Sequence, residues 1–516
     1  MKYLENFVTA ANAVIWSDAL IYLLLAVGVY FSVRMRFFQV TMIKEMVTAM
    51  FKRNKSSAGI SSFQALAMSL SGRVGTGNIA GVATAIFLGG PGAVFWMWLV
   101  AFLGAGSAFI ESTLAQIYKR NEKGQYRGGP AFYIEKGIKN KRVAKIYAIV
   151  FAIVTILATG LLLPGVQANS IASAVNNAFG VDHSWTGIFL VALLGLIIFG
   201  GIKTIARVAE YVVPFMAVAY VLLALIVMVI NFSKLPEVLG LIFSSAFGLH
   251  ATFGGIVGAM ISMGVKRGVY SNEAGQGTGP HSAAAAEVTH PVNQGLVQAF
   301  SVYIDTLFVC SATAFMILST GMYNVKGPGE ELIVDNGVYY VQDGTKHVDG
   351  SAVYTQAAVD KAFSGQESFD IAYSGPGSYT VAIALFFFAF TTLMAYYYIA
   401  ETNIAYLTHK RGGPLLMFAL KIGILIAVFV GCIRTAELAW SLGDLGVGLM
   451  AWLNIIAILI LQKPALIAFK DYKEQKKART QPVFDPVRLG IADADFWVKV
   501  YQEKQKEKDA SRSETR

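Results

Sequence analysis

The chain has 516 residues, 55% of them hydrophobic and 14% charged, and its mean hydropathy of +0.55 excludes an ordinary soluble domain. Apolar runs of about eighteen residues or more recur along it, and these are long enough to cross a hydrocarbon core as helices, whereas a membrane barrel would show alternating strands. The net charge of +10 does not indicate a nucleic-acid partner. Its basic residues gather in segments 34–55, 119–145 and from 463 onward, as the positive-inside rule expects of cytoplasmic segments.

Eleven transmembrane helices are predicted from these runs, in an all-α polytopic membrane protein. The first is a retained helix rather than a signal peptide, because its apolar run follows Glu5 and Asp18 and not a basic region with a cleavage site. With the basic connections in the cytoplasm, the amino terminus lies outside and the carboxyl tail inside, as an odd number of crossings requires. The predicted ranges are 17–34, 62–88, 92–118, 144–178, 185–202, 208–231, 252–289, 295–320, 378–406, 413–432 and 434–461.

The chain divides into a core and two flanking parts. Residues 1–58 hold an extra helix and a basic cytoplasmic loop, residues 59–462 form the core, and residues 463–516 form a basic cytoplasmic tail. The tail is expected to be a surface helix followed by disorder. Within the core, residues 321–378 are predicted to be an external insertion, because they contain little Lys or Arg and alternate short strand-prone runs with Asp-Gly turns.

The stretch Ser71–Asn78, which reads SGRVGTGN, interrupts the second hydrophobic run near its middle. A continuous helix would be destabilised at each glycine and would bury the charge of Arg73. An unwound turn at membrane depth is tolerated where it lines a protein cavity, and its freed N–H and C=O groups can then bind carboxylates and cations. Glycines can also serve close helix packing. Arg73 and Asn78 in the same stretch favour a broken helix.

A second interruption falls in the segment 252–289, which is too long for one straight crossing. Two stretches could break it, Ser262–Gly264 and the glycine-rich 271–280. The sequence does not decide between them, although the positive-inside rule favours the first at the midplane and the second as a cytoplasmic gate beside Lys266 and Arg267. Two broken helices, one in each half of a ten-helix core, indicate an inverted-repeat transporter with its site between the repeats.

Three motifs carry a resemblance to a known family: Gly75–Thr84 (GTGNIAGVAT), Gly89–Leu99 (GGPGAVFWMWL) and Gly268–Gly275 (GVYSNEAG). With them the chain resembles the alanine or glycine:cation symporter family from about Val14 to Gln462. The resemblance implies a leucine-transporter-type fold, in which two inverted sets of five helices form the core, here preceded by one extra helix.

Sodium requires hard oxygen ligands, which carbonyls of an unwound helix and facing hydroxyls can supply. The pair Thr391–Thr392 interrupts the apolar run of segment 378–406. The resemblance implies that this pair faces the carbonyls of Ser71 and Val74 at a sodium site, and Asn78 could complete the ion's shell. The alternative is that the threonine hydroxyls bond back to carbonyls one turn earlier.

The substrate is expected at the same break. Its carboxylate would meet backbone N–H groups at the amino end of the outer half-helix, where the helix dipole favours negative charge. Its amine would meet carbonyls or hydroxyls of the second broken segment. Gln167 is a further polar candidate, which could equally serve only to hydrogen-bond a neighbouring helix. The predicted substrate contacts are Gly75, Thr76, Gly77, Asn78, Gln167, Ser262, Met263, Gly264 and Thr392.

Charged residues inside predicted spans are candidates for gating or charge pairing. They are Arg73, Glu111, Asp305 and Glu273. One of the acids Glu111 and Asp305 could pair with Arg73 and only neutralise it, because an unpaired arginine at this depth is costly.

The predicted function is sodium-driven uptake of a small neutral amino acid, alanine or glycine, across the cell membrane by alternating access. Na⁺ is the transported coupling ion, and no organic cofactor, nucleic-acid partner or enzymatic activity is expected. Glutamine as the substrate and the proton as the coupling ion remain alternatives. An ion channel is the alternative from another class, because glycine-rich backbone also builds ion filters. The sequence does not indicate an oligomeric state.

Overall fold

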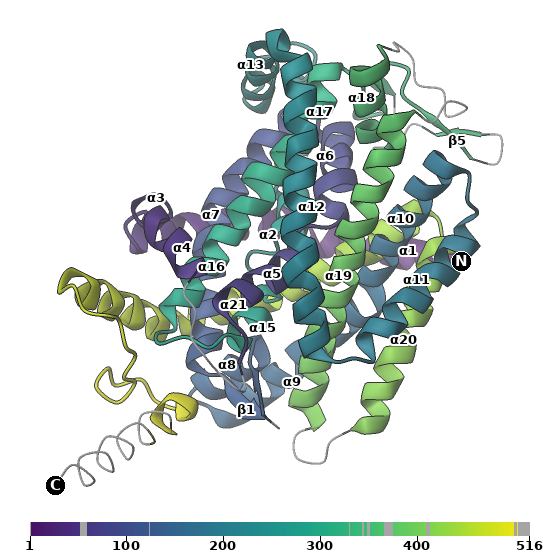
Figure 1. Cartoon of the computed structure of the whole chain (residues 1–516). Coiled ribbons are helices and arrows are strands. Elements are labelled where there is room, and N and C mark those ends of the chain that lie inside the picture. The colour runs from purple at the N-terminus through teal and green to yellow at the C-terminus, as the bar shows by residue number, and fades with distance from the viewer. Residues whose placement is uncertain are drawn as a thin grey trace, which may run out of the picture.

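Long apolar helices make up most of the molecule (Figure 1). The computed structural model describes residues 2–51, 59–122, 124–329, 331–342, 345–347, 351–365, 375–408, 413–499 and 503. Within these residues, seven segments are long and apolar enough to span a membrane: Ala93–Ile117, Lys141–Phe179, Lys203–Ile230, Val292–Thr320, Pro376–Thr408, Pro414–Ile433 and Ala436–Lys477. A pair of helices bent by 42°, Tyr3–Ile15 with Asp18–Arg34, could form an eighth. The predominantly helical membrane fold predicted from the sequence is confirmed.

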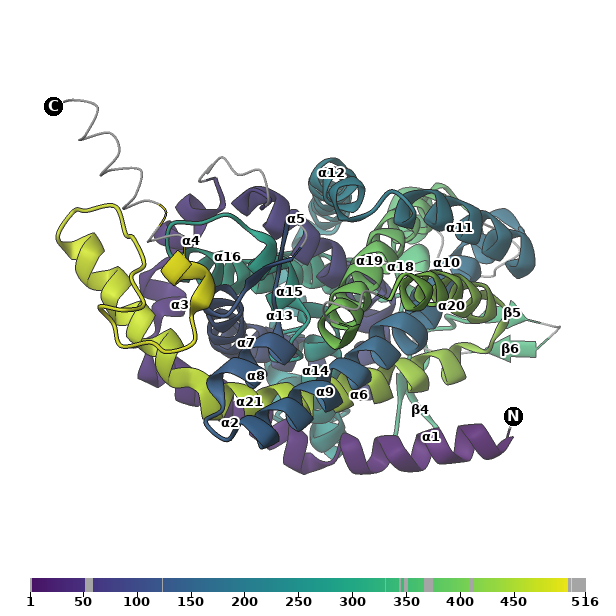
Figure 2. The ribbon, with the colours of Figure 1, turned by 90° about the horizontal axis from the view of Figure 1, so that it is seen from below.

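The amino-terminal part holds one long helix and two short ones that were not predicted from the sequence. The helix α1 (Lys2–Ile15) precedes α2 (Asp18–Arg34), and both lie along one side of the bundle (Figure 2). The indole N–H of Trp16 donates to the Asp444 carbonyl at 2.8 Å, and the Trp452 indole donates to the Ile15 carbonyl at 2.9 Å. These bonds hold α1 and its junction with α2 against the carboxyl-terminal helix α21 (Ala436–Lys477). Two short helices, α3 (Phe38–Thr41) and α4 (Ile43–Met50), follow in the predicted basic loop.

The first predicted break is present. The helix α5 (Ser62–Arg73) begins with a capping box, in which the Ser61 hydroxyl accepts from the Gln64 N–H and the Gln64 side chain accepts from the Ser61 N–H. After Arg73 the chain leaves the helix, and it re-forms one through the π-helical turn η1 (Gly77–Gly81) and α6 (Val82–Gly89). Such turns relieve the strict helical hydrogen-bond pattern and occur often at functional sites.

The second break lies at residues 273–278, within the glycine-rich stretch that was one of its two candidates, and the other candidate, Ser262–Gly264, is not a break. Those three residues sit inside the continuous helix α14 (Val257–Asn272), where Gly264 allows close packing because a side chain there would collide with Trp96. The chain then unwinds before α15 (Gly279–Ala285), with positive φ at Glu273 (56°), Gly275 (84°) and Gly277 (85°). Only residues that tolerate the left-handed region can end a helix in this way.

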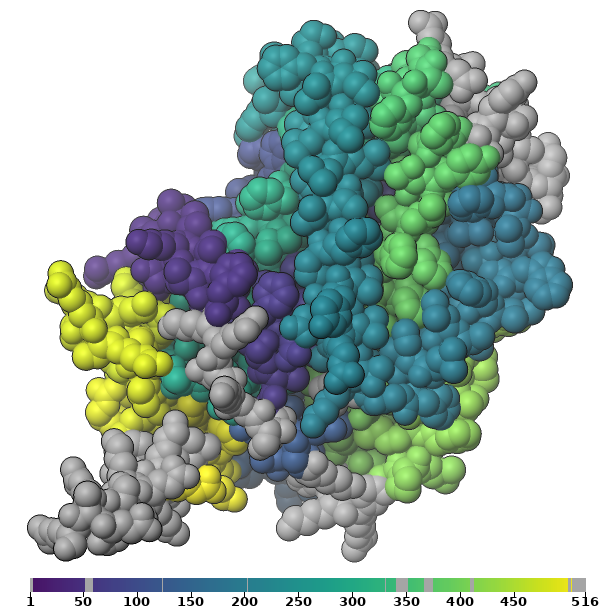
Figure 3. All heavy atoms as spheres, viewed as in Figure 1, coloured from purple at the N-terminus to yellow at the C-terminus, as the bar shows by residue number. Residues whose placement is uncertain are grey.

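The remaining helices surround these two broken segments. In Figure 1, α12 (Ile202–Ile230) and α19 (Pro376–Thr408) rise side by side, and Figure 3 shows α12 on the outer face over its whole length. Its exposed side chains from Tyr211 to Ile230 are apolar, which suits contact with lipid, whereas Lys203 and Arg207 near its start are exposed and charged. The others are α7 (Ala93–Ile117), α8 (Pro130–Gly137), α9 (Lys141–Leu157), η2 (Ala158–Leu162), α10 (Leu163–Phe179), α11 (His183–Ile198), η3 (Phe232–Lys234), α13 (Leu235–Ala246), η4 (Gly254–Ile256), α16 (Val292–Val302), η5 (Tyr303–Cys310), α17 (Ser311–Thr320) and α20 (Pro414–Ile433).

The predicted insertion 321–378 contains strands, as expected, and also a helix that was not expected. Four strands among its described residues form two small antiparallel pairs, β3 (Val325–Lys326) with β4 (Leu332–Val334) and β5 (Tyr340–Gln342) with β6 (Thr345–His347). The helix α18 (Val353–Ser364) places the buried Asp360 carboxylate against the start of α19, where it accepts from the N–H groups of Gly377 at 2.7 Å and Ser378 at 3.1 Å. The insertion therefore caps a core helix.

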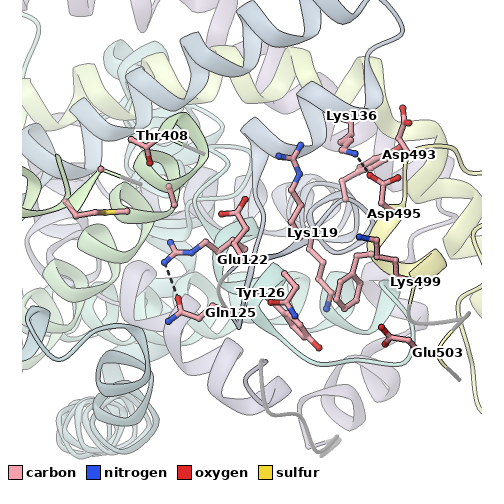
Figure 4. A pocket seen from close by; sticks show the side chains of 18 of the residues that line it. Lys119, Glu122, Gln125, Tyr126, Lys136, Thr408, Asp493, Asp495, Lys499 and Glu503 are labelled. Atoms are coloured by element: carbon pink, nitrogen blue, oxygen red, sulfur yellow. Dashed lines mark hydrogen bonds and ion pairs between the residues drawn. The ribbon is translucent and has the colours of Figure 1, made fainter. Parts of the chain in front are cut away.

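The predicted tail is more ordered than expected. The helix α21 runs through the proposed boundary at Gln462 without a break, and residues 478–499 pack back onto the body of the protein. The Trp497 indole donates to the Gln116 carbonyl at 2.8 Å, and Lys141 pairs with Asp493 at 2.8 Å. Figure 4 shows this region, with Lys136 and Asp495 also paired. Disorder was predicted for the end of the tail, and residues 500–516, apart from Glu503, lie outside the described residues.

A cavity of about 850 Å³ lies beside the tail. Its walls include a short hairpin, β1 (Arg120–Glu122) with β2 (Gln125–Arg127), and the facing ends of α19 and α20 (Figure 4). None of the predicted substrate or sodium contacts lines it.

Candidate functional site

The backbone of the first break is held by two side-chain amides. The Gly75 N–H donates to the Asn78 side-chain carbonyl at 2.8 Å, and the Thr76 N–H donates to the Gln167 side-chain carbonyl at 3.0 Å. Gln167 lies on α10, so it contacts the break itself and not only a neighbouring helix. Two of the three N–H groups expected to meet a substrate carboxylate are thus already bonded to side chains.

The predicted pair Thr391–Thr392 splits into two different environments. The Thr392 hydroxyl donates to the Ser71 carbonyl at 2.9 Å and also lies 3.0 Å from the Phe388 carbonyl one turn earlier. The Thr391 hydroxyl bonds to the same Phe388 carbonyl at 3.0 Å and contacts the sulfur of Met216 on α12 at 3.8 Å. Thr392 therefore faces the break, as expected, while Thr391 faces away from it toward α12.

A second polar cluster adjoins the break around Asp305. Its buried carboxylate accepts from the Asn78 amide at 2.6 Å, the Ser271 hydroxyl at 2.9 Å and the Thr306 hydroxyl at 2.7 Å. Asn78 belongs to η1, Ser271 to the end of α14 and Asp305 to η5. This cluster joins both broken segments to a third helix.

Two of these partners were missed from the sequence. Ser271 belongs to the Gly268–Gly275 motif, and no feature of the sequence indicated Thr306. The wall opposite the break is formed by the end of α14, because a side chain on Gly77 would lie 3.1 Å from the Ser271 Cα and 3.3 Å from the Tyr270 ring. Tyr270 was missed as well. Its only sequence signal was its place in the Gly268–Gly275 motif.

The predicted contacts Ser262, Met263 and Gly264 do not join this cluster. They lie within α14, one or more turns before Ser271, and Met263 and Gly264 pack against the end of α6 and against α7. These three residues therefore lie apart from the polar groups that surround the first break.

Arg73 does not form the predicted ion pair with Glu111 or Asp305. Among the described residues, its guanidinium donates instead to the Gln298 carbonyl at 3.0 Å and to the Ser301 hydroxyl. All three acids, Glu111, Glu273 and Asp305, are buried and lie within electrostatic reach of Arg73. None of them makes a salt bridge within the part of the chain that the structure describes. Three buried carboxylates therefore share one arginine.

Comparison with known proteins identifies the family. A family model described as the sodium:alanine symporter family matches residues 1–486. The chain is 59% identical, over 96% of its length and 98% of the relative's, to the putative sodium/proton-dependent alanine carrier protein YrbD of Bacillus subtilis. It is 43% identical, over 94% of each chain, to the probable sodium/glutamine symporter GlnT of the same organism.

A solved structure supports the fold alone. A mutant of the Eremococcus coleocola manganese transporter superposes with a TM-score of 0.52 at 13% identity, covering 86% of this chain and 95% of the other. The match to the family model and the identity to YrbD extend over almost the whole chain. The chain belongs to the sodium:alanine symporter family.

Proposed function

We propose that this protein couples the entry of Na⁺ to the uptake of alanine by alternating access, at a site built on the break between α5 and η1. The alanine assignment is supported by the 59% identity to a relative named as a sodium/proton-dependent alanine carrier. Family membership and the apolar spans support a place in the cell membrane.

The observation that carries the proposal is the 2.9 Å approach of the Thr392 hydroxyl to the Ser71 carbonyl. It brings two oxygens from different helices to the point where α5 ends. Carbonyls freed at the end of a half-helix and a facing hydroxyl are suitable ligands for Na⁺. The proposed sodium ligands are the Ser71 and Val74 carbonyls and the Thr392 hydroxyl. Thr391 is no longer proposed as a ligand.

Asp305 and Asn78 supply a place for a second positive charge. An ionised carboxylate that is fully buried among neutral donors is costly unless a cation neutralises it. The Asp305 carboxylate accepts from three such donors, and Asn78 links it directly to Gly75 at the break. A cation at this position would lie beside the bound substrate.

The carboxylate of alanine is proposed to bind at the Thr76 N–H in place of Gln167. This N–H lies at the start of the outer half-helix, where the dipole favours an anion. The Thr76 hydroxyl is buried and has no hydrogen-bond partner among the described residues, so it is free to join the same carboxylate. The proposed substrate contacts are Gly75, Thr76, Gly77, Asn78, Gln167 and Thr392.

The proposed topology has eleven crossings, with the amino terminus outside and the tail in the cytoplasm. Four further crossings add to the seven long spans. They are α2, α11 and the two broken segments, α5 with α6 and α14 with α15. The ten crossings after α2 would form the two inverted sets of five. The basic character of the tail supports its cytoplasmic location.

Two alternatives follow from the relatives' names. GlnT, at 43% identity, is named as a probable glutamine symporter, and YrbD is named as both sodium- and proton-dependent. Glutamine uptake and a contribution of the proton to coupling are therefore the competing proposals. Glycine is a further candidate substrate, because it differs from alanine only by one methyl group.

Uptake of labelled alanine into proteoliposomes tests the proposal, first under an inward Na⁺ gradient and then with K⁺ in place of Na⁺. The matched variants are Thr392→Ala and Thr391→Ala. Removal of one ligand costs about 1–2 kcal/mol, so the Na⁺ concentration for half-maximal uptake should rise about tenfold in Thr392→Ala and stay near the wild-type value in Thr391→Ala. Equal alanine uptake with Na⁺ and with K⁺ would contradict sodium coupling. A failure to accumulate alanine, glycine or glutamine would contradict the proposed transport.

A further inference from the structure

Glu111 is a buried acid that has no part in the proposed sodium and alanine sites. It lies on α7, and its carboxylate accepts from the Asn454 amide at 2.6 Å and from the Gly275 N–H at 3.4 Å. The same Asn454 amide donates to the Gly275 carbonyl at 2.9 Å, and the Tyr133 hydroxyl donates to the Asn454 side-chain carbonyl. Three segments therefore meet at one carboxylate, α7, α21 and the second break, and α8 is linked to it through Asn454.

The partners of Glu111 are all neutral. Within its electrostatic reach lie Arg73 on α5 and Tyr133 on α8. Arg73 is bonded to the Gln298 carbonyl and is shared with Glu273 and Asp305. An ionised Glu111 is thus held by the Asn454 amide and by backbone N–H groups of Gly275 and Gly277, with no cation bonded to it among the described residues. Burial of an ionised carboxylate that has only neutral donors costs desolvation free energy. A bound proton removes this cost because it neutralises the charge.

The bonds of Glu111 hold the second break in place. Gly275 and Gly277 lie in the left-handed region on either side of Gln276, and a side chain on Gly277 would collide with Pro130 of α8. The unwound segment is therefore packed tightly against α8 and α21. Any movement of α15 away from these helices must break the bonds that Gly275 makes with Glu111 and Asn454.

We propose that Glu111 is a proton-binding site, and that proton binding there releases the second break from α7 and α21. The inference rests on the proposed function, to which it adds the residue through which protons act on transport. The ionised carboxylate accepts from Gly275 and Asn454. When a proton forms an O–H bond on the carboxylate, one acceptor becomes a donor that faces the donor N–H of Gly275. The segment 273–278 is then free to move.

The test compares Na⁺-driven alanine uptake by wild type, Glu111→Gln and Glu437→Gln over a series of pH values set equally on both sides of the membrane. Glutamine keeps the size of Glu111 and fixes its protonated character, whereas Glu437 is an exposed acid at the start of α21. Alanine uptake by wild type and by Glu437→Gln should change about fivefold or more over the pH series, because in both proteins the titration of Glu111 controls the release of the second break. Uptake by Glu111→Gln should change less than about twofold.

The outcomes separate the two claims. A Glu111→Gln protein that keeps the wild-type pH profile overturns the proton site and leaves sodium-driven uptake standing. Failure of the wild type to accumulate any amino acid overturns the proposed function and the inference with it. If Glu111→Gln does not fold, Tyr133→Phe decides. Loss of the Tyr133 hydroxyl weakens the Asn454 amide as a donor to the ionised Glu111 carboxylate. The pH dependence of alanine uptake should therefore shift to higher pH. A pH dependence equal to that of the wild type overturns the proposal.

Discussion

Thr76 and Gln167 are joined by a hydrogen bond of 3.0 Å from the backbone N–H of the first to the side-chain carbonyl of the second. An amide oxygen of α10 therefore occupies the amino-terminal end of the outer half-helix, the position at which a helix dipole favours an anion. In the proposed function, the carboxylate of alanine replaces the Gln167 side-chain oxygen as the acceptor of this N–H.

Gln167→Glu should therefore weaken alanine binding. A glutamate would place a fixed carboxylate on the Thr76 N–H and would repel the carboxylate of the substrate. We expect the alanine concentration for half-maximal uptake to rise by about tenfold or more. Gln167→Ala, which frees the N–H without adding charge, should have the smaller effect. Equal alanine affinity in Gln167→Glu and the wild type would exclude the exchange of Gln167 for substrate.

Asp305→Asn should lower the affinity for Na⁺ while leaving the fold intact. Asparagine keeps the size of the side chain and one acceptor oxygen, but it removes the negative charge that a second cation would neutralise. The Na⁺ concentration for half-maximal alanine uptake should rise about tenfold or more. The control is Asp182→Asn at the exposed N-cap of α11, where asparagine caps a helix as well as aspartate does. An unchanged Na⁺ titration in Asp305→Asn would contradict the second cation site.

The sequence was sufficient to locate the first break and several of its neighbours. Glycines and polar residues inside an apolar run are visible without a structure, because a membrane helix excludes them unless they have partners. Gln167 and Asp305 were predicted on the same ground, Thr392 was predicted from its polarity together with the family resemblance, and all three contact the break or Asn78.

The remaining site residues depended on packing that no local pattern reveals. Thr391 and Thr392 are equally polar, and only the rotation of α19 against α5 and α12 decides which one meets Ser71. The second break was left between two candidates because the positive-inside rule constrains loops and not where within a span a helix unwinds. Gly264, which resembled a break, serves close contact with Trp96 instead.

Trp497→Ala should release the carboxyl-terminal tail from the body of the protein. The side chain is buried, its indole donates to the Gln116 carbonyl, and its ring lies edge-on to Phe484 at 5.2 Å. Truncation of a buried aromatic side chain costs about 3–5 kcal/mol. This cost should exceed the free energy that binds the short tail segment to the body of the protein. Tryptic cleavage at Arg488 should become at least about tenfold faster. Val487→Ala is the control, because Val487 is exposed. Equal cleavage rates in both variants would contradict the anchoring role of Trp497.

Lys119 should make the stability of the protein depend on pH. It follows α7 outside the membrane span, and its ammonium donates to the Ala286 carbonyl at 2.8 Å and lies 4.4 Å from the centre of the Tyr126 ring. Burial lowers the pKa of Lys119 to about 7, against the smaller opposing effect of Glu287. Its pKa in the unfolded chain is about 10.4, so the unfolded state binds more protons between these two values and stability rises with pH across that window.

Lys119→Met removes this titrating group and keeps the length of the side chain. The melting temperature of the wild type should rise between about pH 7 and pH 9 relative to that of Lys119→Met, measured in detergent by tryptophan fluorescence. Parallel curves for the two proteins over this range would show that Lys119 does not titrate there.

Gly75→Ala should abolish transport for a purely steric reason. Gly75 does not adopt the left-handed conformation, so alanine suits its backbone. Its methyl group, however, would collide with the Thr392 hydroxyl and lie 3.1 Å from the Gln167 side-chain oxygen. One carbon atom would thus disturb the proposed sodium ligand and the substrate N–H together, and both Na⁺-dependent uptake and alanine binding should be lost. Gly81→Ala is the matched control in the same segment, because the nearest atom to its methyl group, on Trp440, is 3.7 Å away. Comparable uptake by the two variants would mean that the space between Gly75, Thr392 and Gln167 is not the site.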